Sequence, residues 1–272
     1  MRGIIIAAGA GNRMGALTAE RPKCMLPVAD RPLLDWTMDS MRAAGCREFV
    51  VVTGYQQERI PESGFRRVEN ADYENNNILH SLMCAREFIE GPVMVSYSDI
   101  WVEPAIHVRL AEAPGEIIAA VDRDWIPYYE GRTEHPVAEA ENMFLDTSGA
   151  VVSAGKHLRP EDAGDLLCGE FLGLWRMTAE GSARFRQAFE TIDGELQPTT
   201  PFQQAAEWRR AYITDMVQYL INQGSRIDTA LIDRGWAELD TAQDYERLPE
   251  IAARQEMHTL NRALTSTTRN ET

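Results

Sequence analysis

Lysine is nearly absent from this chain of 272 residues. Of its 27 basic residues, only Lys23 and Lys156 are lysines, and all the others are arginines. A compact ammonium and a planar guanidinium are not interchangeable where a site needs a point charge. The two lysines are therefore the first candidates for a functional role.

Positive charge as a whole is also scarce. The 42 acidic residues outnumber the 27 basic ones and give a formal net charge of −15. Proteins that bind nucleic acids or anionic membranes need a basic surface, so we expect neither partner. No apolar run approaches the ~20 residues of a membrane-spanning helix, and the apolar residues 3–8 are too few for a secretory signal.

Closely spaced cysteine pairs are missing as well. Cys24, Cys46, Cys84 and Cys168 include no Cys-x-x-C motif. This spacing argues against both a disulfide framework and a zinc site. It predicts reduced thiols in a cytoplasmic protein.

The first 121 residues alternate between predicted strands and helices. Short β-rich runs occupy residues 4–8, 49–53, 93–97 and 116–121, and helical periodicity occupies 32–44 and 78–89. Repeated units of this kind predict an α/β fold with a mostly parallel sheet and helices on both faces.

Beyond residue 122 the pattern changes. Residues 122–141 are rich in aromatic and charged side chains and show no clear period. Further strands are expected at 142–145, 150–154, 171–175 and 236–239, and helices at 178–191, 201–222 and 241–256. With no internal repeat or linker, we expect one domain over residues 1–258 with an elaborated second half, followed by a frayed tail at 259–272.

A glycine-rich loop, residues 7–15, follows the first predicted strand. It lacks the third glycine of the dinucleotide fingerprint and the Gly-Lys-Ser/Thr of a Walker loop. Exposed backbone N–H groups in such a loop can nevertheless contact phosphates. Residues 1–31 contain five basic and two acidic side chains, so positive charge is concentrated at this end. A tight turn with scattered solvated charges is the alternative interpretation.

Residues 4–14 read Ile-Ile-Ile-Ala-Ala-Gly-Ala-Gly-Asn-Arg-Met, and residues 21–28 read Arg-Pro-Lys-Cys-Met-Leu-Pro-Val. These two segments resemble the signature of nucleotidyltransferases that make nucleoside-diphosphate sugars and alcohols. The resemblance implies a single Rossmann-like domain, with a mixed, mostly parallel central sheet flanked by helices and a substrate-side elaboration. It also implies that Arg13 and Lys23 neutralise the nucleotide phosphates, which the loop wraps with Ala8, Gly9, Ala10, Gly11 and Asn12.

Two later segments resemble bacterial phosphocholine and phosphonate cytidylyltransferases within that superfamily. Residues 70–82 resemble their nucleotide-contacting turn, which implies nucleotide contacts for Asn76, Asn77 and Ser81. Residues 238–245 resemble their carboxy-terminal metal segment. The Gln-Pro-x-Gly-Leu segment of the sugar-phosphate branch is absent. The resemblance thus divides the chain into a nucleotide-binding half, 1–121, and an acceptor-binding and metal-completing half, 122–258.

Two aspartates follow predicted strands, Asp99 after 93–97 and Asp240 after 236–239. Ligand sites of open α/β sheets lie beyond the carboxyl ends of the strands, and Mg²⁺ prefers a few carboxylate oxygens together with waters and substrate phosphates. We therefore expect Asp99 and Asp240 to hold one Mg²⁺ ion. Alternatively, Asp240 caps the following helix, with Gln243 at its third position.

The candidate acceptor-binding residues combine rings with charges. A ring face together with a carboxylate holds an ammonium group well, and a basic side chain holds a phosphate. These candidates are Trp125, Tyr129, Arg132, Lys156, Glu170 and Asp215. Asp215 shares a helix face with Tyr212 and Tyr219, although a solvated face has the same pattern. His135 and His157 show no metal-ligand spacing and are interpreted as incidental.

Together these features predict a Mg²⁺-dependent cytidylyltransferase with Lys23, Arg13, Asp99 and Asp240 as catalytic residues. It would transfer CMP from CTP to a small phosphate or phosphonate monoester, such as phosphocholine or 2-aminoethylphosphonate, and release pyrophosphate. A sugar-1-phosphate nucleotidyltransferase that uses UTP, GTP or dTTP is the alternative enzyme. A nucleotide-binding regulatory protein without catalysis is the alternative from another class. The sequence leaves the oligomeric state open, a homodimer included.

Overall fold

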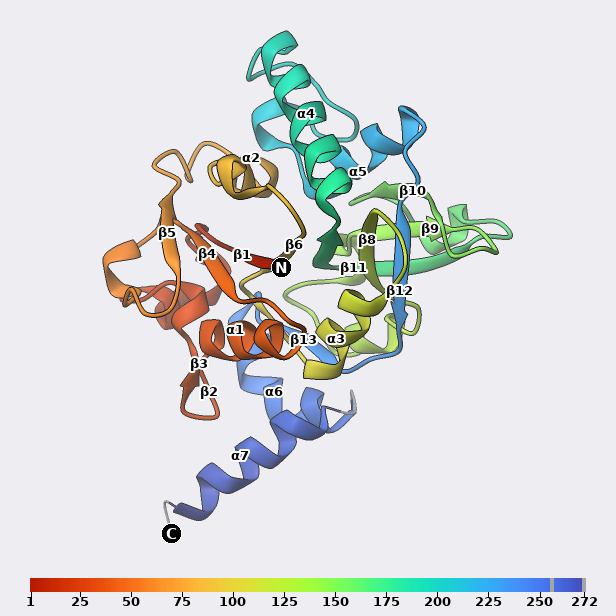
Figure 1. Cartoon of the computed structure of the whole chain (residues 1–272). Coiled ribbons are helices and arrows are strands. Elements are labelled where there is room, and N and C mark those ends of the chain that lie inside the picture. The colour runs from red at the N-terminus through yellow and green to blue at the C-terminus, as the bar shows by residue number, and fades with distance from the viewer. Residues whose placement is uncertain (255–256, 271–272) are drawn as a thin grey trace.

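The computed structural model describes residues 1–254 and 257–270, and Figure 1 shows a central sheet between two layers of helices. The amino-terminal part of this sheet is parallel. β1 (Arg2–Ala7) lies between β4 (Glu48–Thr53) and β6 (Val93–Tyr97). β5 (Arg66–Glu69) pairs with β4 at the sheet edge.

The remaining strands run in both directions. The long β11 (Leu167–Met177) is antiparallel to β6, to β8 (Ile117–Asp122) and to β9 (Asn142–Leu145). β10 (Val151–Gly155) pairs antiparallel with β9, and β12 (Asp228–Ile232) pairs parallel with β8. The predicted α/β fold with a mixed, mostly parallel central sheet is confirmed.

The first strand shows why this sheet is covered on both faces. Ile5 belongs to a core cluster with Leu34, while its neighbours Ile4 and Ile6 belong to a second cluster with Leu79. An uninterrupted apolar run is typical of a strand that is buried on both sides, because successive side chains point to opposite faces.

Helices from both halves of the chain form the two layers. One face carries α1 (Leu33–Ala43), α3 (Pro104–Glu112) and α6 (Ala242–Arg254). The other carries α2 (Ile78–Met83), α4 (Ala179–Glu195) and α5 (Ile213–Asn222) (Figure 1). Among the described residues, no helix is long and apolar enough to cross a membrane.

A two-stranded sheet joins the two halves near the ends of the central strands. β7 (Ile100–Val102) pairs antiparallel with β13 (Trp236–Glu238), so that Glu238 lies opposite Ile100. A second short pair, β2 (Pro27–Val28) and β3 (Arg31–Pro32), forms a hairpin. The pairing of β7 with β13 brings the chain beyond residue 238 to the carboxyl end of β6.

Several predicted boundaries are corrected. The helix expected at 78–89 ends at Met83 and is followed by a 3-10 turn at Arg86–Phe88, and the helix expected at 201–222 begins only at Ile213. The strands β5 and β12 were not expected. Within the predicted helix 241–256, α6 ends at Arg254, and residues 255–256 lie outside the described chain.

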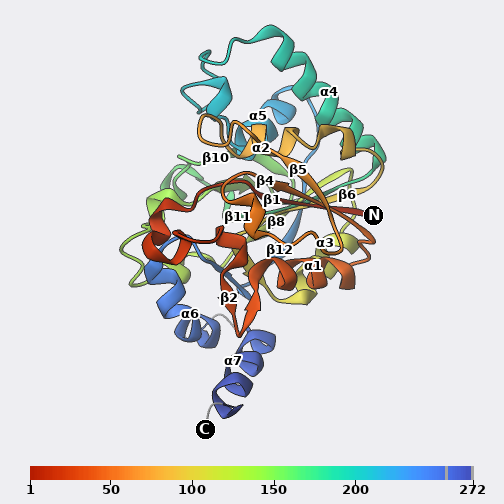
Figure 2. The same ribbon diagram turned by 90° about the vertical axis from the view of Figure 1, so that its left-hand side faces the viewer.

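The segment expected to be a frayed tail contains a helix, α7 (His258–Asn270). Met257 and Leu260 are fully buried against the domain, which gives this helix an anchor. Figure 2 shows α7 extending away from the rest of the molecule. The last two residues of the predicted tail, 271–272, lie outside the described residues.

Candidate active site

A cavity of about 280 Å³ lies at the carboxyl ends of β1 and β6. Its wall includes Gly9 and Gly11 from the loop after β1, Asp99 from the turn after β6, and Asp240 from the turn after β13. This is the edge at which open α/β sheets place their ligands. The two halves of the chain therefore both contribute to one site.

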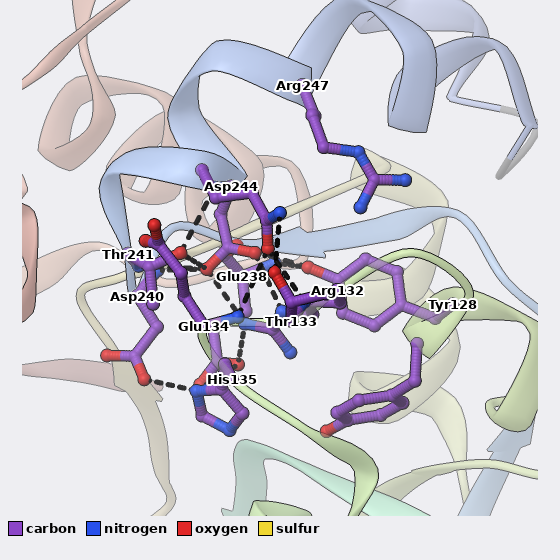
Figure 3. A network of polar contacts seen from close by, with 12 residues as sticks. Tyr128, Arg132, Thr133, Glu134, His135, Glu238, Asp240, Thr241, Asp244 and Arg247 are labelled. Atoms are coloured by element: carbon purple, nitrogen blue, oxygen red, sulfur yellow. Dashed lines mark hydrogen bonds and ion pairs between the residues drawn. The ribbon is translucent and has the colours of Figure 1, made fainter.

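Lys23 is the centre of the charged cluster in this cavity. Its Nζ donates hydrogen bonds to Oδ2 of Asp99 at 3.1 Å and to Oδ1 of Asp240 at 2.8 Å. The second oxygen of Asp240 forms an ion pair with Arg13. The same oxygen lies 2.5 Å from Nδ1 of His135 (Figure 3). One carboxylate thus contacts three basic side chains.

The glycine loop adopts a conformation that favours glycine next to Lys23. Gly11 has a φ of +62°, and a Cβ built on it would lie 3.2 Å from Cε of Lys23. The carbonyl of Gly11 accepts hydrogen bonds from the N–H of Met14 and the hydroxyl of Thr18. Lys23 itself begins a 3-10 turn after the extended Pro22. Gly11 therefore allows the loop to turn tightly while the lysine stem passes close to its backbone.

Asp240 reaches the cavity through the turn between β13 and α6. The N–H of Leu239 donates to the carbonyl of Asp99 at 2.7 Å, which joins the two aspartate-bearing turns directly. The helix cap lies one residue further than the alternative considered above: Oγ1 of Thr241 accepts from the N–H of Asp244, and Asp244 accepts from the N–H of Thr241. Since Thr241 caps α6, the carboxylate of Asp240 is available for the cavity.

These contacts fix the protonation states at the centre of the cluster. Burial alone would lower the pKa of Lys23, but Asp99 and Asp240 hold it above its ordinary value. Burial alone would raise the pKa of Asp240, but Lys23, His135 and Arg13 hold it well below its usual range. At neutral pH the pair is therefore an ammonium and a carboxylate.

Two further residues give this cluster the character of a metal site. Ligand atoms of His135, Glu238 and Asp240 all lie within 4.8 Å of one another. Burial and the neighbouring Asp240 raise the pKa of Glu238, as expected where two carboxylates share a site. Carboxylates in such a group suit a divalent cation.

Sequence reasoning had interpreted His135 as incidental and had not selected Glu238. Glu238 is the first residue of the segment 238–245 that resembles a metal segment, and this resemblance could have indicated it. The contact of His135 joins residues 105 positions apart.

The arrangement has the parts of a site for a polyphosphate. It combines a glycine loop after a buried strand, an ammonium, and carboxylates that can accept a metal. A family model, the MobA-like NTP transferase domain, matches residues 3–161. The chain belongs to this family. The predicted resemblance to nucleotidyltransferases is thereby confirmed, and Lys23 and Asp99 lie inside the matched range.

Curated relatives of this NTP transferase include two cytidylyltransferase-like proteins. The CTP:phosphoglutamine cytidylyltransferase of Campylobacter jejuni is 25% identical over 258 residues, which cover 90% of this chain and 98% of the relative. The CMP-5'-(3-aminopropyl)phosphonate synthase of Streptomyces rubellomurinus is 36% identical over 135 residues, which cover 47% of this chain and 22% of the relative.

Solved structures show the same fold at low identity. The CTP:phosphocholine cytidylyltransferase of Streptococcus pneumoniae matches with a TM-score of 0.69 at 19% identity, over 92% of this chain and 98% of that chain. The inositol-1-phosphate CTP transferase of T. maritima matches with a TM-score of 0.68 at 19% identity, over 92% and 96% of the two chains.

The residues expected to contact the nucleotide are largely brought together. Ala8, Gly9, Gly11, Arg13, Lys23, Asn76, Asn77 and Ser81 all line the cavity, whereas Ala10 and Asn12 belong to the same loop but do not line it. The buried Asn70 exchanges two side-chain hydrogen bonds with Asn76, at 2.9 and 3.0 Å, and a third reaches Ser81. Asn77 precedes α2, but its side chain donates to the carbonyl of Arg210 instead of capping the helix.

Only three of the six predicted acceptor residues line the cavity: Tyr129, Lys156 and Glu170. Trp125 was expected to bind the acceptor but does not line the cavity. Its side chain is fully buried and packs edge-on against Tyr129. Its Nε1 donates to the carbonyl of Cys168. Trp125 therefore supports the cavity wall from behind.

Asp215 was also expected to bind the acceptor and does not line the cavity either. Because α5 begins at Ile213, Asp215 occupies its third position and accepts hydrogen bonds from the N–H groups of Tyr212 and Gln204 at 2.8 and 3.0 Å. Its carboxylate is buried in a capping box. It is therefore not available to a ligand.

Arg132 is the third expected acceptor-binding residue that does not line the cavity. Its side chain is 1% exposed and forms ion pairs with Asp244 and Glu238 (Figure 3). At the acceptor end, the lining residues include Glu139 and Glu141, which were not predicted from the sequence. No spacing in the sequence links these residues to Lys156, and only the folded chain brings them together.

At that end, Nζ of Lys156 lies 3.1 Å from Glu139 and 5.0 Å from the centre of the Tyr212 ring. Burial raises the pKa of Glu141 to about 7. Its Oε2 accepts a hydrogen bond from Thr214. Carboxylates therefore dominate this end of the cavity, with one ammonium among them.

Proposed function

We propose that this NTP transferase is a Mg²⁺-dependent cytidylyltransferase. It would transfer CMP from CTP to a small phosphate or phosphonate monoester and release pyrophosphate. The observation that carries this proposal is the contact of Lys23 with both Asp99 and Asp240 beside the glycine loop. The named activities of the relatives, which include several transfers from CTP, support the choice of cytidine.

The chemistry requires positioning and charge neutralisation more than covalent catalysis. An oxyanion of the acceptor would attack the α-phosphorus in line, and pyrophosphate would leave on the opposite side. Lys23 would stabilise the negative charge that develops on the α-phosphate and the leaving group, because its contacts with Asp99 and Asp240 keep the buried ammonium protonated. Arg13, whose side chain is half exposed, would contact the outer phosphates.

The donor set fits a magnesium ion. Asp99 and Asp240 both lie within hydrogen-bond distance of one ammonium, and the low pKa of Asp240 keeps it ionised. Mg²⁺ is bound by one or two carboxylates together with substrate phosphates, and these two residues would hold it. When bound, the ion supplies charge neutralisation for the triphosphate.

The acceptor would occupy the end of the cavity lined by Lys156, Tyr129 and Glu170. Lys156 is the remaining basic side chain there, so we assign to it the phosphate or phosphonate of the acceptor. Phosphocholine and 2-aminoethylphosphonate both combine such an anion with a cationic group, which suits an end rich in carboxylates.

Pyrophosphate release tests the proposal. The enzyme would be assayed with each of CTP, UTP, GTP and dTTP and with phosphocholine, 2-aminoethylphosphonate and glucose 1-phosphate, in Mg²⁺ and in EDTA. We expect release only with CTP, Mg²⁺ and a nitrogen-bearing acceptor, and none from the Lys23→Ala variant. Release with glucose 1-phosphate and another nucleotide would support the sugar branch, and CTP binding without release would indicate a regulatory protein.

A further inference from the structure

Glu170 has one carboxylate oxygen without a partner. The residue lies on β11, is 5% exposed and lines the cavity. The hydroxyl of Tyr129 donates to Oε1, but Oε2 is buried and has no hydrogen-bond partner in the described part of the chain. A buried carboxylate oxygen without a donor is costly, so the site is built for a donor that a ligand brings.

Tyr97 presents a second group of this kind. Tyr97 also lines the cavity, and its buried hydroxyl has no hydrogen-bond partner within the described residues. Its ring packs edge-on against that of Phe171, the residue after Glu170, at 6.2 Å between centroids. Two unsatisfied oxygen atoms therefore belong to adjoining parts of the cavity wall.

The charges of the cavity point to a cationic ligand. Six carboxyl groups line it, against the two lysines Lys23 and Lys156, one arginine, Arg13, and one histidine, His135. Lys23 and Arg13 pair with aspartates at the nucleotide end, and Lys156 pairs with Glu139. Among the described side chains, no basic group forms an ion pair with Glu141 or Glu170, whose carboxyl groups accept hydrogen bonds from Thr214 and Tyr129. A ligand with only negative charge would supply no positive partner to either carboxyl group.

The unsatisfied atoms of Glu170 and Tyr97 are hydrogen-bonding oxygens, and one face of each of two tyrosine rings in the cavity wall is already covered by a cation. The guanidinium of Arg132 lies over the Tyr129 ring at 5.2 Å, and the ammonium of Lys156 lies over the Tyr212 ring at 5.0 Å. A trimethylammonium group binds to ring faces and has no N–H to donate. A primary ammonium donates up to three hydrogen bonds, so it can satisfy the unpartnered oxygen atoms of Glu170 and Tyr97.

We infer that the acceptor carries a primary ammonium group that donates to Oε2 of Glu170, and that the site discriminates against the N-methylated form of the same molecule. The acceptor class is thus an amino-alkyl phosphate or phosphonate. The inference rests on the proposed cytidylyl transfer, within which it selects among the acceptors.

A methylation series tests this with one variable. The value of kcat/KM is measured with saturating CTP for phosphoethanolamine, its N-methyl and N,N-dimethyl forms, and phosphocholine, with propyl phosphate as the neutral comparison. Sites that hydrogen-bond an N–H reject analogues without it strongly. We expect a decrease at each step, with phosphocholine and propyl phosphate each at least about tenfold below phosphoethanolamine.

The variants Glu170→Gln and Glu141→Gln make a matched pair, because each removes one unpaired carboxylate from the same end of the cavity. We expect Glu170→Gln to reduce the ratio between phosphoethanolamine and phosphocholine toward one, and Glu141→Gln to leave most of it. Thermal unfolding shows whether each variant folds, and the series on the unmodified enzyme stands without them.

Each outcome decides between distinct possibilities. Equal or faster turnover of phosphocholine or propyl phosphate would overturn the inference while leaving cytidylyl transfer intact. A ratio that survives Glu170→Gln but is lost in Glu141→Gln would overturn the assignment to Glu170. No pyrophosphate release from CTP with any of these acceptors or with 2-aminoethylphosphonate would instead contradict the proposed function.

Discussion

Two clusters of ion pairs meet at the turn between β13 and α6, one open to the cavity and the other mostly buried, with Glu238 at its edge lining the cavity. In the cavity cluster, Lys23 and Asp240 pair beside Arg13, whose side chain is 50% exposed. In the buried cluster, the side chains of Arg132 and Asp244 are each 1% exposed (Figure 3). Asp240 and Asp244 lie only four residues apart, so the difference arises from the partners that surround them.

The buried cluster holds the turn in place. Arg132 donates two hydrogen bonds to Asp244, at 2.7 and 3.0 Å, and one to Glu238 at 2.7 Å. Asp244 in turn accepts from the N–H groups of Asp240 and Thr241 at 3.1 and 2.8 Å. Every link is a charge-assisted or backbone hydrogen bond, and the side chains of Arg132 and Asp244 are almost completely buried. Arg132 is thus a positioning residue for the Asp240 carboxylate.

The charges of the two clusters have different roles. In the cavity cluster, a substrate and a metal ion can replace the partners, so its ion pairs serve function. In the buried cluster, nothing can replace a missing partner, and an unpaired buried charge is strongly unfavourable. We therefore expect substitutions in the first cluster to reduce turnover at constant stability, and substitutions in the second to reduce stability first.

The largest effect is expected for Lys23→Ala. Removal of its ammonium takes away the charge that would stabilise the α-phosphate, and we expect turnover to decrease by at least about 10³-fold. Pyrophosphate release measures this, and urea unfolding should show little loss of stability.

Lys23→Arg sharpens the same test, because it retains the charge but places a wider group beside Gly11. Most activity should again be lost. Near-normal turnover in either variant would show that Lys23 takes no part in the reaction. The ion pairs of the cavity cluster would then have no demonstrated role in catalysis.

The second effect concerns stability. Arg132→Met leaves Asp244 and Glu238 without their buried partner, and we expect the free energy of unfolding to decrease by about 3 kcal/mol or more. Urea-induced unfolding measures it. The Mg²⁺ concentration for half-maximal activity should rise as well, because the Asp240 turn loses its support.

Arg132→Lys is the matched control. It retains a positive charge but cannot donate the paired hydrogen bonds of a guanidinium, so its stability should lie between those of the parent and Arg132→Met. A change below about 1 kcal/mol in Arg132→Met, within the range of exposed ion pairs, would show that the buried cluster does not differ from a surface one.

Sequence reasoning was strong where the information is local. The scarcity of lysine, the motif around Lys23 and the strand ends before Asp99 and Asp240 lie in short segments, and the structure brings these residues together. It failed at Arg132, because an arginine beside aromatic residues looks the same in an acceptor pocket as in a buried pair. The deciding partner, Asp244, lies 112 residues away.

The error at Asp215 has a different physical origin. A helix expected from residue 201 places Asp215 in its interior, on a face with Tyr212 and Tyr219. The helix begins at Ile213, where the same residue becomes a cap. A cap depends on the boundary of its helix, and boundaries are the feature that periodicity determines least well.

The third effect tests whether unpaired cavity charges reduce stability. Burial raises the pKa of Glu141 from an ordinary value of 4.5 to about 7. Below pH 4.5 the Glu141 side chain is neutral in both the folded and the unfolded protein. As the pH rises through about 7, it ionises in the folded protein as well, and the folded protein has by then lost stability relative to the unfolded chain. Glu141→Gln should therefore be more stable than the parent at pH 8 by on the order of 2 kcal/mol, with little difference at pH 4.

Chemical unfolding across this pH range measures the difference. The groups that act on Glu141 include Lys156, Thr214, Asp215 and Glu238, and none of them changes in the variant. An unaltered pH profile in Glu141→Gln would mean that this cavity carboxylate carries no cost in stability.

The smallest effect lies where the two clusters join. Thr241→Ala removes the hydroxyl that accepts from the N–H of Asp244 and donates to its carboxylate. Loss of a helix cap costs about 1 kcal/mol. The matched control is Thr178→Ala, because Thr178 caps α4 in the same way by accepting from Gly181, and it does not line the cavity. Both variants should lose similar stability, but only Thr241→Ala should lower kcat, by a few-fold, since it loosens the turn that carries Asp240. Equal kcat in the two variants would show that the buried cluster supports the fold without positioning the site.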